Sequence, residues 1–386
     1  MNIFYISPSE IPSRSANSIH VLSQTEAFSR LNEDVYLFCN RTIKDEELFH
    51  ESVRENYGID SQKINVISYH SSFNRAMNLR IAILSIFYMF THPSPDMIIS
   101  RNLYASFFLA VIFRKRIFFE THQLEFGFKR FLQMLIVRSK KTTTIVISKE
   151  LLRFLKKHIW TDEFDHMILH DAARDDLEPI NETRRRELLD EVNPEQNWKT
   201  ICSYFGAIHF GRGVEVIHAM AKLRPEVLFL IYGGTKKECN KINQDLEINN
   251  LVHYPHIPYH HALERMQIAD ILLMPYQRKL GVGIDGKGAN TSDWMSPMKM
   301  FDYLASGVPI ISSDLKPLRE VLEHKRNSML SDPIDVNAWL LSLDALMADR
   351  EFSNGIAKNA YLDYKANYTW TLRSRSIINK HGKMKK

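Results

Sequence analysis

Two series of alternating strands and helices, separated by one polar stretch, dominate the sequence. The first series begins with a strand expected at Ile3–Ile6 and an apolar-periodic helix at Ser18–Leu31. Such alternation is typical of parallel βαβ units, in which helices cover a buried sheet. The sequence therefore predicts an α/β fold. Further strands of this series are expected at Val35–Phe38, Met97–Ser100, Ile117–Phe119, Thr142–Ile147 and Met167–Leu169.

The polar stretch runs from Asp171 to Trp198, and the pattern then restarts with strands expected at Thr200–Phe205 and Val227–Tyr232. A chain of 386 residues is long enough for two such domains. We expect a first domain over 1–175 and a second over 176–365. A C-terminal helix or tail over 366–386 could cross back to the first domain.

Composition narrows the class of protein. Hydrophobic residues make up 45% and charged residues 25%, as in a globular protein, and a net charge of +5 is too small to argue for nucleic acid. Three scattered cysteines, Cys39, Cys202 and Cys239, offer no disulfide framework and fit a reducing cytoplasm. No secretory signal is visible, and the apolar runs Ile81–Phe90 and Ala105–Phe113 are too short to span a bilayer. We expect a cytoplasmic protein, at most peripheral to the inner face of a membrane.

The segment Asp293–Glu323 is the most informative part of the chain. Ser296 and Pro297 have the chemistry of an N-cap and a first helical residue. The helix start would present free backbone N–H groups and Lys299 would add a positive charge, which together suit a diphosphate. Asp302, one turn further on, could accept hydrogen bonds from ribose hydroxyls.

This segment resembles the nucleotide-sugar site of family 4 glycosyltransferases of the GT-B fold. The consensus sequence of that site is close to SP-x-K-x-FEY-x-A-x-G-x-P. The resemblance covers nearly the whole chain and is strongest from Tyr204 to Glu323. It implies two Rossmann-like parallel-sheet domains facing across a cleft, a nucleoside-diphosphate sugar as donor, and no metal or other cofactor. The donor-binding residues that it implies are Gly206, Arg212, Lys287, Ser296, Pro297, Met298, Lys299 and Asp302.

The chain departs from the family pattern at two positions. In the glycine loop after Phe205, the family has an arginine behind the first glycine, where this chain has Ala207, and a lysine five residues later, where it has Arg212. Arg212 can bind a diphosphate through two N–H groups. Either His209 or Lys287 could supply the second positive charge. In addition, Trp294 stands where the family has its first glutamate, so the sugar-facing carboxylate is absent from its usual place.

The first half of the chain resembles the family through shorter stretches. The strand expected at Ile117–Phe119 is followed by Glu-Thr-His, which resembles the strand-end histidine of the family. His122 would accordingly face the donor sugar. His170 and Asp171 resemble the family's hinge between the domains, but the same two residues also fit a simple turn.

A long polar loop is expected from Ser7 to His20. Its last residues resemble a family segment that leads to a histidine at the start of the first helix, although the usual glycines are missing. The resemblance places Asn17, Ser18 and His20 on the acceptor side, facing the acceptor or the diphosphate.

Two loops rich in glycine or histidine allow more than one interpretation. The glycine-rich loop Gly281–Asn290 fits a lid that orders over the donor, or a flexible surface loop.

A cluster of histidines suggests a metal site, but prolines interrupt any helix that would align its members, and no cysteine or acidic residue lies among them. We therefore expect no metal at His253, His256, His260 and His261.

Basic residues dominate the stretch 114–157, and Phe128 and Phe131 lie among them at helical spacing. Such a surface can rest on anionic lipid, or it can be a solvated face over a packed helix. Nucleic-acid binding is less well supported, because no base-reading motif accompanies the charge.

The function implied is a retaining glycosyltransferase that moves a sugar from a nucleoside-diphosphate donor to a hydroxyl of a saccharide acceptor. The acceptor would be lipid-linked, as in surface polysaccharide or lipopolysaccharide assembly. His122, Arg212 and Asp302 are the expected catalytic residues. Two alternatives stay open: a catalytically silent subunit that binds nucleotide sugar or a partner, and a sugar-nucleotide epimerase. The nucleotide base, the sugar and the linkage are not specified by the sequence.

Overall fold

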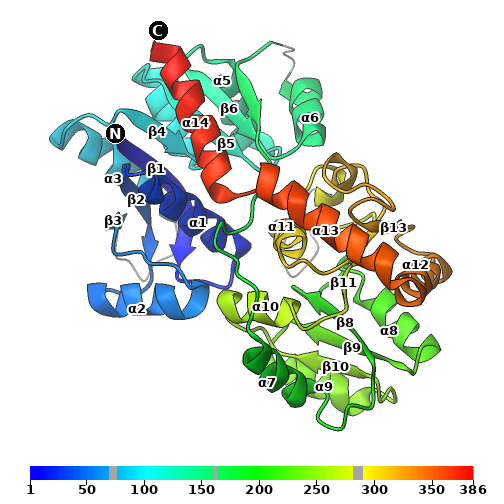
Figure 1. Cartoon of the computed structure of the whole chain (residues 1–386). Coiled ribbons are helices and arrows are strands. Elements are labelled where there is room, and N and C mark those ends of the chain that lie inside the picture. Colours follow the sequence, from blue (N-terminus) through cyan, green and yellow to red (C-terminus); the bar gives the residue numbers. More distant parts are fainter. Residues whose placement is uncertain (69–75, 160–162, 281–289, 386) are drawn as a thin grey trace. The chain divides into compact units, whose positions relative to one another are not determined.

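The computed structural model describes residues 1–68, 76–159, 163–280 and 290–385. The chain forms two compact units, which are described separately. The first consists of Met1–Asp171 together with Trp370–Lys386, and the second of Ala172–Thr369 (Figure 1).

The first unit is built on a seven-stranded sheet with the order β3-β2-β1-β4-β5-β6-β7, in which all paired strands are parallel. The order reverses between β1 and β4. Because βαβ crossovers are right-handed, this reversal places α1 and α3 on opposite faces of the sheet. The strands are β1 (Asn2–Ile11), β2 (Asp34–Arg41), β3 (Ile64–Ser68), β4 (Met97–Ser100), β5 (Ile117–Thr121), β6 (Thr142–Val146) and β7 (His166–Ile168).

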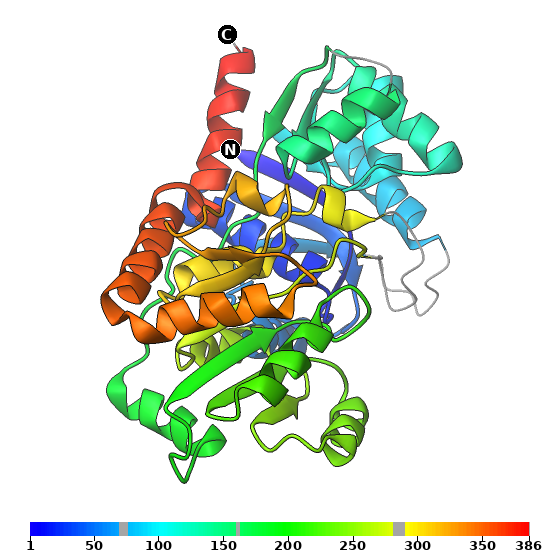
Figure 2. The ribbon, with the colours of Figure 1, turned by 90° about the vertical axis from the view of Figure 1, so that its right-hand side faces the viewer.

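The helices of this unit cover a sheet whose central strands are almost fully buried. Helix α1 packs on β1 and β2 and against α14, the C-terminal helix, while α3 packs on the same strands and beside α4. Figure 2 shows α14, in red, at the C-terminal end of the chain. The helices are α1 (Ala16–Arg30), α2 (Glu46–Tyr57), α3 (Met77–Thr91), α4 (Leu103–Phe107) with a π-helical turn (Phe108–Ile112), α5 (Gly127–Arg138), α6 (Lys149–Ile159) and α14 (Trp370–Lys385).

Strand β1 is longer than the sequence pattern predicts. After an irregularity in register between Ile6 and Glu10, pairing with β2 resumes at Glu10 and Ile11. The bulge lets the buried Ser7 and Ser9 lie within the strand. The predicted loop from Ser7 to His20 is therefore wrong at both ends, because β1 continues to Ile11 and α1 already begins at Ala16.

The second unit repeats the same architecture with six parallel strands in the order β10-β9-β8-β11-β12-β13. Here the order reverses between β8 and β11. The strands are β8 (Thr200–Phe205), β9 (Val227–Tyr232), β10 (Leu251–Tyr254), β11 (Ile271–Met274), β12 (Ile310–Ser313) and β13 (Met329–Ser331). The helices are α7 (Glu182–Val192), α8 (Val214–Leu223), α9 (Lys236–Asp245), α10 (Tyr259–Met266), α11 (Met298–Ala305), α12 (Val336–Ala348) and α13 (Arg350–Asn367).

The polar stretch expected as a boundary contains helix α7, which belongs to the second unit. Its Arg184 pairs with Glu264 of α10, and Arg185 donates to the carbonyl of Gln267. Leu188 is buried beneath it. The two units divide between Asp171 and Ala172, at the start of the stretch, and part of its polar sequence belongs to a helix with a narrow apolar side.

Among the described residues, no helix combines the length and the apolar character that crossing a membrane would require.

Trp370 begins α14 and is 1% exposed, with its ring edge-on to His20 at 4.8 Å. We predict that Trp370→Ala lowers the free energy of unfolding of the first unit by about 3–5 kcal/mol, because it leaves a cavity between α14 and α1. Denaturant titration followed by circular dichroism measures this. Leu362→Ala, at a site 52% exposed on α13, is the matched control and should change stability by less than about 0.5 kcal/mol. Equal effects of the two substitutions would contradict the prediction.

Candidate functional sites

Each unit gathers polar side chains at the carboxyl ends of its strands, next to the point where the strand order reverses. This is where open parallel sheets bind ligands, because neighbouring crossovers leave on opposite faces and open a crevice. In the second unit the cluster follows β8 and β11, and in the first it follows β1, β4 and β5.

In the second unit, Lys299 and Arg212 form a pair of adjacent cations. The Lys299 ammonium lies 4.0 Å from the ring centre of Tyr204 and 4.8 Å from that of Tyr276. The Arg212 guanidinium also lies over the ring of Tyr276, 5.5 Å from the ring centre, and donates a hydrogen bond to the Tyr276 hydroxyl at 3.4 Å. Within the described part of the chain, neither cation has a carboxylate partner, and Lys299 Nζ is buried without any hydrogen-bond acceptor.

Backbone geometry brings these cations against the glycine loop. Gly206 has φ +144°, which L side chains rarely adopt, and a Cβ atom there would lie 2.8 Å from Lys299 Nζ, so a side chain at this position would be strained and would displace the ammonium. Helix α11 is held beside the loop by Tyr303, whose hydroxyl accepts from the Phe205 N–H at 2.9 Å and lies 3.3 Å from the Leu273 carbonyl. The site is therefore fixed by the ends of β8 and β11.

The electrostatic environment of Lys299 disfavours its charge. Burial lowers the pKa of the Lys299 ammonium well below its usual value, and the nearby Arg212 lowers it further. An anion bound between the two cations would reverse both effects. Lys299 is the cation next to Arg212 among the described residues, and the choice between His209 and Lys287 for a further positive charge stays a prediction. His209 lies near Glu238, whose pKa it helps to lower.

The start of α11 differs from the prediction. The N-cap is Pro297, with extended backbone angles and no side-chain capping bond, and the first helical residue is Met298, not Pro297. Ser296 is one residue too early to cap, and it is 5% exposed. Asp302 is 3% exposed and accepts a hydrogen bond of 2.7 Å from the Tyr259 hydroxyl. Its role toward a ribose stays a prediction.

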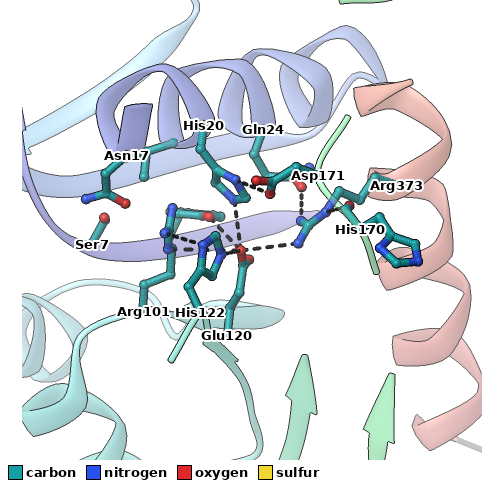
Figure 3. Close-up of polar contacts among 12 residues, drawn as sticks. Ser7, Asn17, His20, Gln24, Arg101, Glu120, His122, His170, Asp171 and Arg373 are labelled. Atoms are coloured by element: carbon teal, nitrogen blue, oxygen red, sulfur yellow. Dashed lines mark hydrogen bonds and ion pairs between the residues drawn. The ribbon is translucent and has the colours of Figure 1, made fainter. Parts of the chain in front are cut away.

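In the first unit, the buried carboxylate of Glu120 is the centre of a charged cluster (Figure 3). Its Oε1 lies 2.7 Å from His122 Nε2, 2.8 Å from His20 Nε2 and 3.2 Å from Arg373 Nη2. Arg101 Nε is more distant, at 4.0 Å. These cationic and N–H neighbours hold the pKa of Glu120 well below its usual value despite the opposing effect of burial.

Asp171 and Arg373 extend this cluster. His20 Nδ1 lies 2.9 Å from Asp171 Oδ1, so the ring of His20 lies between two carboxylates. Arg373 donates to the His170 carbonyl at 3.0 Å and to the side chain of Gln24. The cluster thus joins β5, α1, the segment after β7 and α14, which are remote from one another in sequence.

The tautomer of His122 follows from its neighbours. Its Nδ1 lies 3.4 Å from Arg101 Nη2, which can only donate, so Nδ1 accepts and Nε2–H donates to Glu120. Burial and the charge of Arg101 lower the pKa of His122 to about 4, so the ring is neutral near pH 7. His122 is 27% exposed, and its proposed contact with a donor sugar stays a prediction.

The three acceptor-side residues fall into two groups. Asn17 lines a cavity at the strand ends and donates to Ser9 Oγ at 2.6 Å. Ser18 is buried and donates to the Glu10 carbonyl at 2.7 Å, and His20 is buried between the carboxylates. Ser18 is thus bonded to the backbone of β1 and His20 to the Glu120 cluster, and the expectation that they face a substrate stays a prediction.

One group of described residues, His20, Glu120 and His122, has ligand atoms close enough together to hold a metal ion. The same carboxylate oxygen is already approached by Arg373, with Arg101 nearby. Two guanidinium charges oppose binding of a cation there, so the donor set fits an internal ion cluster better than a metal site. Lys287 and most of the loop Gly281–Asn290 lie outside the described residues.

Several residues of these sites were missed by the sequence analysis. Arg101 directly follows β4, so its place at a strand end was a usable signal. Tyr204 and Tyr276 lie at the ends of β8 and β11 but look like ordinary core aromatics. Arg373 gave no signal, because it lies more than 200 residues from its partners.

Comparison with known proteins supports this architecture. Residues 187–363, within the second unit, match the family model described as Glycosyl transferases group 1. Among curated proteins, no significant match to the chain was found. Several hundred solved chains are similar in structure.

Three of these solved structures illustrate the likeness. Sucrose-phosphate synthase from Thermosynechococcus elongatus has a TM-score of 0.75 at 14% identity, covering 99% of this chain and 98% of that one. HepE from Anabaena, in complex with UDP, has a TM-score of 0.72 at 14% identity, covering 99% and 100%. WaaG, a glycosyltransferase involved in lipopolysaccharide biosynthesis, has a TM-score of 0.67 at 11% identity, covering 97% and 98%. The chain therefore has the GT-B fold of two parallel-sheet α/β domains, as the sequence predicted.

Because the charged form of Lys299 is disfavoured without a ligand, we predict that binding of a nucleoside diphosphate takes up protons at pH values above the lowered pKa. Affinity should accordingly fall as the pH rises through that range. Calorimetric titration with UDP in buffers of different ionisation enthalpy measures the uptake. Lys299→Met should remove the proton uptake, and Lys222→Met, on the exposed side of α8, should leave it unchanged. An unchanged proton uptake in Lys299→Met would contradict the prediction.

His122 gives a second prediction, on stability. Its folded pKa of about 4 lies below the usual 6.5, so the unfolded chain binds a proton that the folded chain does not. The free energy of unfolding should therefore decrease by up to about 3 kcal/mol as the pH falls from about 6.5 to 4. Glu120 and Asp171, with lowered pKa values, contribute only at still lower pH. Denaturant titrations of wild type and His122→Gln across this range test it, and parallel pH profiles would refute it.

Proposed function

We propose that this chain is a retaining glycosyltransferase that uses a nucleoside-diphosphate sugar as donor. The observation that carries the proposal is the pair Lys299 and Arg212, which lack carboxylate partners within the described residues and both lie over the ring of Tyr276, with Lys299 Nζ next to Gly206. Two adjacent cations without counter-charge are costly unless an anion joins them, and a diphosphate has the charge to do so. Match to the group 1 model over 187–363 supports the same function.

In this proposal the protein acts mainly by stabilising the leaving group. Arg212 and Lys299 would hold the diphosphate as negative charge develops on it, which is the largest contribution available from preorganised charges. Gly206 allows the ammonium to reach its position, and the start of α11, with Ser296, Pro297 and Met298, lies next to Lys299. Asp302 would receive the ribose and His122 would orient the sugar. The released phosphate would take the proton of the acceptor hydroxyl on the same face.

The two alternatives make different demands on the cation pair. A silent scaffold needs no buried unpaired lysine, and keeping one is costly. An epimerase would act on the donor without an acceptor. Among the similar structures, HepE is a complex with UDP and WaaG is a glycosyltransferase, and transfer to a saccharide is the function that we favour here.

A surface of the first unit supports a lipid-linked acceptor at a membrane. Helix α3 is mostly apolar, and the sheet covers only one of its sides, so Ile83, Phe87 and Phe90 are each about 60% exposed. Phe113 packs edge-on against Phe90 at 5.3 Å, which joins α3 to the π-helical turn. We call the exposed apolar residues of α3, the π-helical turn and the start of α5 the aromatic face; they are Leu79, Ile83, Phe87, Phe90, Ile112, Phe113, Phe126, Phe128 and Phe131.

Cations accompany the aromatic face. Arg114 and Lys115 follow Phe113, are exposed, and have no carboxylate partner among the described residues, and Lys129 is exposed on α5. Exposed apolar groups next to unpaired cations suit the surface of an anionic bilayer. Within the basic stretch 114–157, α6 buries Leu151 and Leu155, so the apolar contact proposed here comes from α3 and α5, not from α6.

Transfer is tested by incubating the purified protein with UDP-, GDP- and ADP-sugars and membrane extract, and by following the anomeric configuration of the product by NMR. Arg212→Ala should lower turnover by about 10²-fold or more, because it removes half of the diphosphate site. Arg319→Ala, an exposed arginine paired with Asp314, should not. A normal rate for Arg212→Ala would remove the observation on which the proposal rests.

Membrane contact is tested by co-sedimentation with vesicles that contain phosphatidylglycerol. Phe87→Ser with Phe90→Ser should release the protein, since two exposed aromatic groups no longer enter the interface. Leu341→Ser, 70% exposed in the second unit, is the matched control. If wild type and the double variant sediment alike, the aromatic face is not a membrane surface.

A further inference from the structure

A cavity of about 320 Å³ opens at the carboxyl ends of β1, β4 and β5 within the first unit. Asn17 of α1, Asn78 of α3, Arg101, Tyr104 of α4, His122 and Lys129 of α5 line it. Most of the lining residues are polar or charged, and Leu103 and Tyr104 add apolar surface, so the cavity suits a small polar ligand.

Arg101 is the residue in this cavity whose bonding is incomplete. Its backbone N–H donates to the Ile6 carbonyl at 2.8 Å, which fixes the side chain at the end of β4. The side chain is only 9% exposed. Nη1 is buried and has no acceptor in the described residues. Nη2 lies 3.4 Å from His122 Nδ1, and the side chain also forms a hydrogen bond with the Tyr5 hydroxyl.

Glu120 cannot complete the bonding of Arg101. The nearest approach is 4.0 Å, from Arg101 Nε to Oε1, beyond hydrogen-bond distance. That oxygen is already approached by His20, His122 and Arg373. The guanidinium therefore retains N–H groups that could bind an anion, and leaving a buried charged donor unsatisfied is costly.

The other charges of the cavity do not supply that anion. Glu125 accepts from the amide of Gln123 at 3.2 Å and has its own N–H bonded to Gln133. Lys129 is exposed at the rim and adds a second positive charge. An acidic group entering the cavity would meet Arg101 at its floor and Lys129 at its edge.

We infer that this cavity is a subsite for an acidic group, a phosphate or a carboxylate, on the acceptor saccharide. Arg101 would bind the acid, and Leu103 and Tyr104 would contact the sugar ring. The role as acceptor subsite depends on the proposed glycosyl transfer, whereas the binding of an acidic sugar does not. Arg101 is a binding residue in this inference and has no part in the chemical step.

The experiment uses glucose, glucuronate and glucose 1-phosphate as probes, titrated by calorimetry into the full chain saturated with UDP. Saturation fills the Lys299–Arg212 site, so that a sugar phosphate has to bind elsewhere. We expect glucose 1-phosphate, glucuronate or both to bind and glucose not to bind detectably; the stronger of the two acids identifies the group. Arg101→Gln should weaken the binding at least about tenfold, and Arg101→Lys less, because lysine keeps the charge but not the planar fork.

Lys129→Glu is a second variant at an exposed position, where folding is not at risk, and it should also weaken the acidic probes. The affinity for UDP should stay unchanged in all three variants. Equal binding of glucose and the acidic sugars, no binding of any probe, or unchanged affinity in both Arg101→Gln and Lys129→Glu would overturn the inference. If UDP fails to bind the wild type while the acidic probes bind through Arg101, the donor proposal fails and the acidic subsite stands.

Discussion

The buried carboxylate of Glu120 is the interaction on which the first unit depends. A carboxylate without water is stable only when hydrogen bonds and opposite charge compensate it. Here His20 comes from α1, His122 follows β5, and Arg373 comes from α14. Each partner is held by a different part of the chain, so the cluster requires that the C-terminal helix return to the first unit. Trp370, packed against His20, adds apolar contact at the same place.

Each unit contains buried cationic side chains whose bonding is incomplete. In the first, Glu120 is fully surrounded by partners, while Arg101 beside it retains a buried N–H without an acceptor among the described residues. In the second, Lys299 and Arg212 are adjacent and have no carboxylate partner within that part of the chain. Both sets lie where the strand order reverses, so the fold places incompletely bonded cations where a ligand can reach them. Burial makes such cations costly, and an anionic ligand would offset that cost.

The fold could be predicted further than the sites. Alternating strands and helices identified the central strands of both sheets, since each buried strand leaves a continuous apolar run. The edge strands β3, β10 and β13 were not predicted, because they are short and less regularly apolar. The prediction failed at Ser7–Ile11, because polar residues in a bulged strand look like a loop. It also failed at Ser296, because Pro297 ends the extended segment one residue later than the capping pattern suggests. Both errors concern backbone hydrogen bonds, which side-chain identity specifies only weakly.

What the sequence determined by itself was local: the order of strands and helices, the glycine loop with Arg212, and the helix with Lys299 and Asp302. These depend on neighbouring residues and on periodicities that can be read directly. Tertiary structure decided which of these residues meet. It brought Lys299 to Gly206 through Tyr303, joined Arg373 to Glu120 across most of the chain, and buried Ser18 and His20. Such contacts join residues that are far apart in the chain, and their partners are set by packing of the whole unit, which no local pattern encodes.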